Sequence, residues 1–214
     1  MQLVTTTATE QKKTVIFNRP HGADFVLNDG TEIYLQKGKQ CMGFHEGQYI
    51  SDLMCMIERD MADKLPDVDD YYLFNQPTET PTGARTKAVN MIADAIGGEC
   101  LTIELHVNAF GNGAKYDKRK NSAEGHRVFY NAKGKKYAQA MSEAIMANKL
   151  TNTIERPIKK APPWWRWVHN NKGPMLLVEL FFMTNEKETK AANCQAGMQG
   201  FSHGVIDFCW RGWR

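Results

Sequence analysis

Short apolar runs of β-type character recur along the chain, separated by turn residues and polar segments. The clearest is Met175–Leu180, MLLVEL, which is apolar at every position except Glu179 and predicts a buried strand. The other strand candidates are Thr14–Asn18, Asp70–Phe74, Leu101–Leu105 and His126–Tyr130. These runs are short enough to be strands of a sheet.

Between the runs, apolar residues recur at the spacing of an amphipathic helix. The first such stretch, Glu46–Leu65, carries Tyr49, Ile50, Leu53, Met54, Ile57, Met61 and Leu65 at that spacing. Further helices are expected at Thr82–Ile96, Gly134–Leu150 and Glu186–Phe208. The alternation predicts an α/β fold, a single domain with a twisted, mostly parallel or mixed sheet flanked by helices.

Two amino-terminal segments depart from this alternation. Met1–Lys13 is rich in Thr and has no periodicity, so we expect a flexible lead-in followed by a single domain over residues 14–214. Phe25–Leu35 predicts a hairpin, because the turn at Asn28-Asp29-Gly30 tolerates positive φ.

The segment Ile154–Lys172 has the most unusual composition and is expected to be a Pro-rich loop. Lysines and prolines in it lead to Trp164, Trp165, Arg166 and Trp167. Aromatic faces stack on sugar rings or nucleobases, and cations attract phosphates or carboxylates. The loop indicates a recognition surface for a glycan, a peptide or single-stranded nucleic acid, and the alternative is a Trp cluster that caps the core.

Composition excludes several classes of protein. With 214 residues, 42% hydrophobic and 24% charged, the chain is typical of a globular protein. The net charge of +3 is too small to indicate a nucleic-acid partner. The five cysteines lack CxxC spacing, which argues against a disulfide framework or a thiolate zinc site. A signal-peptide pattern and a membrane-length apolar run are both missing from the sequence, so we expect a cytoplasmic protein without stable membrane association.

Four ionisable side chains lie at the ends of predicted elements. His21 and His106 each follow a strand, and Glu46 opens the first helix. Each has an ordinary alternative, either a hydrogen-bonded structural histidine or a carboxylate that stabilises a helix N-terminus. Glu179 is different, because an unpaired charge at the end of a buried strand is costly.

Two imidazoles and one carboxylate are the three protein ligands of a catalytic zinc, and a second carboxylate would supply the base. The helical zinc motif HExxH is excluded, because Tyr49 stands where a second histidine would follow His45 and Glu46. The ligands would instead come from separate elements.

The segments that carry these residues resemble the zinc-dependent N-acetylmuramoyl-L-alanine amidases of the amidase-3 type. Members show a strand leading to Asp-Pro-Gly-His-Gly-Gly, a Glu at a helix start, a strand ending in Ser-Ile-His-Ala-Asn-Ala, and a late Val-Glu-x-Gly-Phe-x-x-Asn. TVIFNRPHGAD, GFHEGQYISDL, LTIELHVNAFGN and LLVELFFMTNEKE are similar to these four segments, in the same order and over nearly the whole chain.

The resemblance implies that His21, Glu46 and His106 bind Zn²⁺ and that Glu179 is the catalytic carboxylate. The bond implied is the amide between N-acetylmuramic acid and L-alanine in peptidoglycan. The expected substrate-binding residues are Arg85, Asn108, Trp164, Trp165, Arg166 and Trp167.

The chain also departs from the family pattern. Pro20 replaces the Gly before the first His, Glu104 replaces the Ser of Ser-Ile-His, and Leu180–Phe181 follow Glu179 where the family has a small residue. Because the first segment matches least well, His45 is an alternative ligand to His21.

A phage endolysin, monomeric and released by a separate holin-type pore, fits a domain of this kind. A second hypothesis is a zinc peptidase or amidohydrolase that acts on another carboxylated substrate with the same ligands. A third is a non-enzymatic binder of glycan or single-stranded nucleic acid through the Trp/Arg loop. Zinc content separates the enzymes from the binder, which needs no metal.

Overall fold

The computed structural model describes residues 13–21, 25–26, 32–33, 38–64, 71–74, 82–119, 123–148 and 153–213. This part of the chain forms a central six-stranded sheet in the order β6-β1-β7-β10-β8-β9. Its strands are β1 (Lys13–Asn18), β6 (Tyr71–Phe74), β7 (Glu99–Asn108), β8 (His126–Tyr130), β9 (Thr153–Lys160) and β10 (Met175–Phe182). The strands β6, β1, β7 and β10 are mutually parallel, whereas β8 and β9 run antiparallel to β10.

Two short hairpins accompany the sheet. β2 (Phe25–Val26) pairs with β3 (Glu32–Ile33), as expected for the segment Phe25–Leu35, whose turn lies outside the described residues. β4 (Gln40–Cys41) pairs with β5 (Phe44–His45) and leads directly into the first helix.

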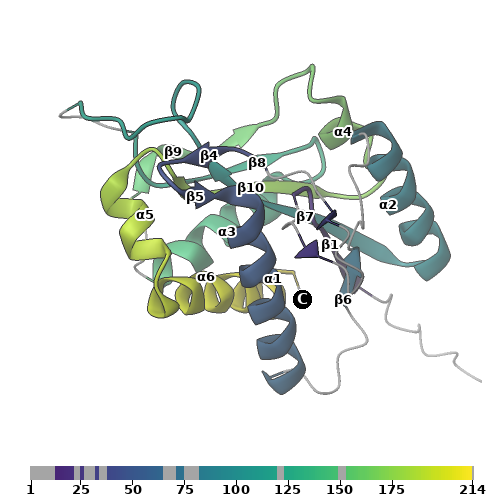
Figure 1. Cartoon of the computed structure of the whole chain (residues 1–214). Coiled ribbons are helices and arrows are strands. Elements are labelled where there is room, and N and C mark those ends of the chain that lie inside the picture. Colours follow the sequence, from purple (N-terminus) through teal and green to yellow (C-terminus); the bar gives the residue numbers. More distant parts are fainter. Residues whose placement is uncertain are drawn as a thin grey trace, which may run out of the picture.

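Helices cover both faces of the sheet (Figure 1). The helices are α1 (Glu46–Lys64), α2 (Thr82–Ile96), α3 (Lys135–Ala147), α4 (Arg166–His169), α5 (Glu186–Ala192), α6 (Gln195–Asp207) and the π-helix η1 (Phe208–Trp213). α1, α3 and α6 pack on one face around a large core that includes Leu105, Val178 and Phe201. The predicted α/β class with a mostly parallel sheet is confirmed.

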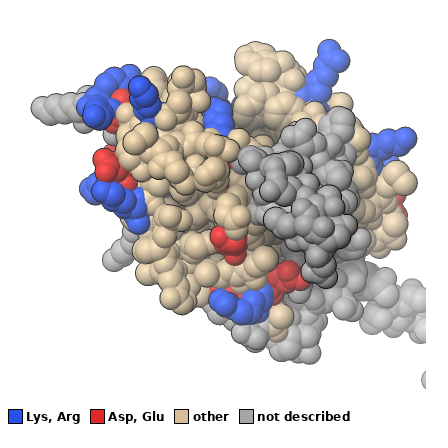
Figure 2. Space-filling model, viewed as in Figure 1, with Lys and Arg blue, Asp and Glu red and all other residues tan. Residues whose placement is uncertain are grey.

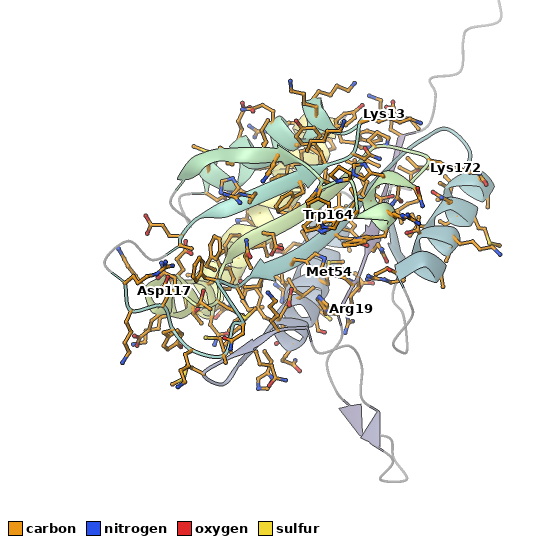
Figure 3. The ribbon with its side chains drawn as sticks, turned by 90° about the horizontal axis from the view of Figure 1, so that it is seen from above. Lys13, Arg19, Met54, Asp117, Trp164 and Lys172 are labelled. Atoms are coloured by element: carbon orange, nitrogen blue, oxygen red, sulfur yellow. The ribbon has the colours of Figure 1, made fainter. Side chains whose placement is uncertain are left out.

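The other face carries α2 and α4, which pack on β1 and on the first half of β10. Figure 3 looks down on this face, with α2 to one side of the strands and Trp164 above them. The pairing register places His106, Glu179 and Arg127 opposite one another on β7, β10 and β8. Because opposite residues of paired strands share a face, these three side chains form one row across the sheet.

The prediction of a loop over Ile154–Lys172 is right only for residues 161–165 and 170–172. Residues 153–160 form β9, and Arg166–His169 form α4. Pro157 and the charged residues of β9 are untypical of a central strand, which is why the pattern did not predict one. They are tolerated because β9 is at the edge of the sheet, where Pro and Lys also discourage further strand pairing.

The predicted helix Glu186–Phe208 is in fact two helices, α5 and α6. The Asn185 side chain accepts a hydrogen bond from the Glu188 N–H at 3.2 Å and starts α5. The Cys194 sulfur accepts one from the Gly197 N–H at 3.4 Å and starts α6. The basic aromatic segment after them continues α6 as η1, and Trp213 in it is buried.

β1 begins at Lys13, one residue before the predicted strand Thr14–Asn18. In the described part of the chain we find no helix long and apolar enough to span a membrane. On the face shown in Figure 2, Lys and Arg lie toward the margins, and the described surface between them carries little charge.

Candidate active site

The carboxyl ends of two neighbouring parallel strands bring His21 and His106 together. His21 comes three residues after β1, and His106 is near the end of β7, its parallel neighbour. The two imidazole ring centroids are 5.1 Å apart, and the rings are nearly perpendicular at 86°. This is the edge at which open α/β sheets gather their ligands.

The helix α1 begins at Glu46 and places its carboxylate against both histidines. Glu46 Oε1 lies 3.3 Å from His106 Nδ1 and 3.6 Å from His21 Nε2. One ligand atom from each of the three side chains lies within 4.8 Å of the other two. His45 is exposed on β5 and is not part of this cluster, which among the described residues contains His21 instead.

The Glu46 carboxylate is buried, and backbone N–H groups hold it in place. Lys39 N–H donates to Oε2 at 2.8 Å, and Val107 N–H donates to Oε1 at 3.0 Å. Gly38 has a φ of 68°, and a Cβ at this position would collide with the carboxylate. The position of this carboxylate therefore rests on the main chain of two separate segments.

The charges within the cluster are strongly coupled. Burial would raise the pKa of Glu46, but the hydrogen bond with His106 and the charges of both histidines lower it to about 2. Burial would lower the pKa of His106, but the neighbouring carboxylates of Glu104 and Glu46 raise it to about 10. The pKa of His21 falls to about 4, first because of burial and then because of His106. The cluster therefore favours one positive charge beside the Glu46 carboxylate.

Glu179 lies next to the cluster on β10, directly opposite His106. Its Oε2 is buried and has no hydrogen-bond partner among the described residues. Burial raises the pKa of this carboxyl to about 7. A register shift in β10 between Glu179 and Phe182 marks a bulge just beyond it, a feature that often reorients side chains beside active sites. A carboxyl of this kind can accept and return a proton near neutral pH.

Two arginines supply positive charge at the site. Arg85 on α2 is buried at 5% exposure, and its Nε and Nη1 have no hydrogen-bond partner among the described residues. Arg127 on β8 lies opposite Glu179, and its buried Nε also lacks a partner there. The sequence singled out Arg85 but missed Arg127, because the strand pattern of HRVFY does not reveal which β10 residue it faces.

The other residues predicted to bind substrate lie in different environments. The side-chain oxygen of Asn108 accepts a hydrogen bond from Ala109 N–H at 2.8 Å, which stabilises the turn after β7. Trp165 stacks on Trp167 with ring centroids 5.3 Å apart, and both pack against a buried cluster over β8 and β10. Trp164 is 74% exposed and, like Arg166, lines a surface cavity of about 740 Å³ beside α2.

Comparison with solved structures identifies the fold. The N-acetylmuramoyl-L-alanine amidase from Clostridium difficile 630 has 20% identity and a TM-score of 0.60, over 94% of this chain and 98% of that one. The catalytic domain of the CD27L endolysin targeting Clostridia difficile has 17% identity and a TM-score of 0.63, over 92% and 97%. The CwlV catalytic domain from Bacillus (Paenibacillus) polymyxa has 15% identity and a TM-score of 0.63, over 92% and 98%. At these identities the likeness establishes a shared fold.

Sequence comparison identifies the family. The comparison with curated proteins gave no match. The family model described as N-acetylmuramoyl-L-alanine amidase matches residues 46–208, which span Glu46, His106 and Glu179 but not His21. A match over most of the chain, joined to this fold and site, shows that the chain belongs to the N-acetylmuramoyl-L-alanine amidase family and is a peptidoglycan amidase.

Proposed function

We propose that this amidase is zinc-dependent and hydrolyses the amide bond between N-acetylmuramic acid and L-alanine. The observation that carries the proposal is the cluster of His21, Glu46 and His106 with Glu179 on the adjoining strand. Three protein ligands and a nearby carboxylate that can act as a base are what a hydrolytic zinc site requires.

The residues present fit zinc. Two imidazoles and a carboxylate are among the donors that zinc prefers, and their close spacing suits one small cation. Glu46 Oε1 approaches both rings, at 3.6 Å from His21 Nε2 and 3.3 Å from His106 Nδ1, so the three ligand atoms converge on one place. Zinc held here would supply Lewis acidity to the scissile carbonyl and to the attacking water.

The protein's own residues then move the proton. Glu179 takes a proton from the attacking water and passes it to the leaving nitrogen of L-alanine, which keeps the amine from re-forming the bond. Its buried Oε2 and its pKa of about 7 suit both halves of this transfer. Arg127, in the same row, limits the rise in this pKa through its positive charge.

In this proposal the substrate binds on the face of the sheet that carries His106, Glu179 and Arg127. Arg85 and Arg127 have buried N–H groups that find no acceptor among the described residues, and such groups suit carboxylates of the peptide. Trp164 and Arg166 line the cavity beside α2, and in this proposal they contact the glycan, while Trp165 and Trp167 pack beneath them on the core. Asn108 would orient the peptide from the end of β7.

The cellular role we propose is that of a phage endolysin. The catalytic domain of an endolysin is among the structures that share the fold. In this proposal the protein is a cytoplasmic monomer without stable membrane association, binds no nucleic acid, and reaches peptidoglycan through a separate holin-type pore.

Product analysis tests the chemistry. Purified peptidoglycan treated with the enzyme should yield new L-alanine amino termini and intact muramic acid, chelation should stop the reaction, and added zinc should restore it. New amino termini from other residues would instead identify a zinc peptidase, the alternative that uses the same ligands. Full activity after chelation would overturn zinc dependence.

A further inference from the structure

A second buried carboxylate, Glu104, lies beneath the cluster. It is 1% exposed in the middle of β7, at the position where the family pattern has Ser. Burying a carboxylate is costly unless its oxygens find partners. The proposed hydrolysis gives Glu104 no role, so it does not explain why a carboxylate is buried here.

The two oxygens of Glu104 face different residues. Oε1 accepts a hydrogen bond from the Asn18 side-chain amide on β1. Oε2 lies 3.6 Å from His106 Nε2, and neither of these two atoms has a hydrogen-bond partner among the described residues. The other ring nitrogen of His106, Nδ1, faces Glu46 Oε1 at 3.3 Å. His106 therefore lies between two carboxylates, one of the cluster and one behind it.

We propose that Glu104 is a positioning residue that accepts the Nε2 proton of His106 and so presents Nδ1, without a proton, to the metal. This inference rests on the proposed zinc dependence. A histidine ligand needs its free nitrogen on the metal side, and a carboxylate behind the ring fixes that tautomer and increases the basicity of the ligand. Asn18 in turn fixes the carboxylate, because its amide occupies the other oxygen.

The neutral variant Glu104→Gln should disturb this arrangement without a large change in shape. If the Gln oxygen keeps the hydrogen bond from Asn18, its NH₂ group faces His106 Nε2 and favours the wrong tautomer. If the Gln oxygen turns toward His106, its NH₂ group meets the Asn18 amide. The first orientation therefore sets a donor against the Nε2 proton of the metal-binding tautomer, and the second sets a donor against the Asn18 amide.

The test measures zinc affinity by competition with a chromophoric chelator, and the His106 tautomer by ¹⁵N NMR of the zinc-loaded protein. Glu104→Gln should weaken zinc binding about 10–100-fold and reduce the population with a proton on Nε2. Asn18→Ala, which frees the carboxylate but keeps it, should weaken binding less. Glu188→Gln is the matched control, a buried carboxylate away from the cluster whose zinc affinity and tautomer should stay at wild-type values.

The outcomes separate this inference from the proposed function. If Glu46→Ala loses zinc but Glu104→Gln binds it as tightly as wild type with an unchanged tautomer, the role of Glu104 is refuted and zinc dependence stands. If wild type itself binds no zinc, the proposed function fails first. Should Glu104→Gln not fold, Glu104→Ser, which restores the family residue, is measured in its place. A wild-type tautomer in that variant would likewise refute the role.

Discussion

Replacing Glu179 by Gln should abolish activity and stabilise the metal-free protein at alkaline pH. The side chain has a buried oxygen without a hydrogen-bond partner among the described residues. Gln has nearly the same shape, so the change removes the charge and leaves the packing in place. Losing the general base should lower kcat by about 10²–10⁴-fold.

The stability gain follows from the pKa of this carboxyl. In the unfolded chain the pKa is near 4.5, and in the folded protein burial raises it to about 7, opposed by His106, Lys39 and Arg127. Between these values the folded protein holds a proton that the unfolded chain has lost, so stability falls as the pH rises from about 4.5 to 7. A difference of about 2.5 in pKa corresponds to about 3 kcal/mol of lost stability above pH 7.

Urea unfolding of chelator-treated protein at pH 5 and pH 8 measures this effect. Glu179→Gln should exceed wild type by about 2–3 kcal/mol at pH 8 and by much less at pH 5. Glu188→Gln should behave in the opposite way, losing stability but keeping activity, because Glu188 accepts N–H groups from Gly125 at 2.7 Å and from Phe182 at 3.0 Å. Equal stability of Glu179→Gln and wild type at both pH values would refute the reasoning.

Three further predictions concern other parts of the fold. Burial lowers the pKa of His126 to about 4, so wild type should lose about 3 kcal/mol as the pH falls from 6.5 to 4, and His126→Gln should lose less over this range in urea unfolding. Gly173→Ala should cost about 1–3 kcal/mol in the same assay, because its Cβ would collide with the Cys100 carbonyl, whereas Gly83→Ala in α2 meets open space and should cost nothing. Trp164→Ala should weaken sedimentation with peptidoglycan without lowering the melting temperature, and a large loss of stability would contradict its placement at the surface.

The sequence was informative about the site because chemistry lies where regular patterns end. His21 follows an apolar strand, His106 lies near the end of another, and Glu179 is the one charge within MLLVEL. Glu46 was identified because it opens an amphipathic helix. Parallel strands bring such ends to one edge of a sheet, so predicting the strands that carry these residues was enough to place them near one another.

The sequence pattern could not predict which residues of neighbouring strands lie opposite one another. Arg127 became relevant only when the register placed it opposite Glu179. In the sequence, Glu104 is recognisable only as a departure from the family pattern. Its contacts with Asn18 and His106 depend on how β1 and β7 align. β9 was missed because an edge strand does not need the apolar alternation that predicts a central one.

The most direct test of the account is zinc stoichiometry, measured by elemental analysis of purified protein alongside loss of peptidoglycan turbidity. Wild type should hold one zinc per chain, and His21→Ala, Glu46→Ala and His106→Ala should each lose zinc and activity together. His45→Ala is the matched control and should keep both, since His45 lies outside the cluster. An active wild-type enzyme without zinc, or zinc retained in all three ligand variants, would contradict the account.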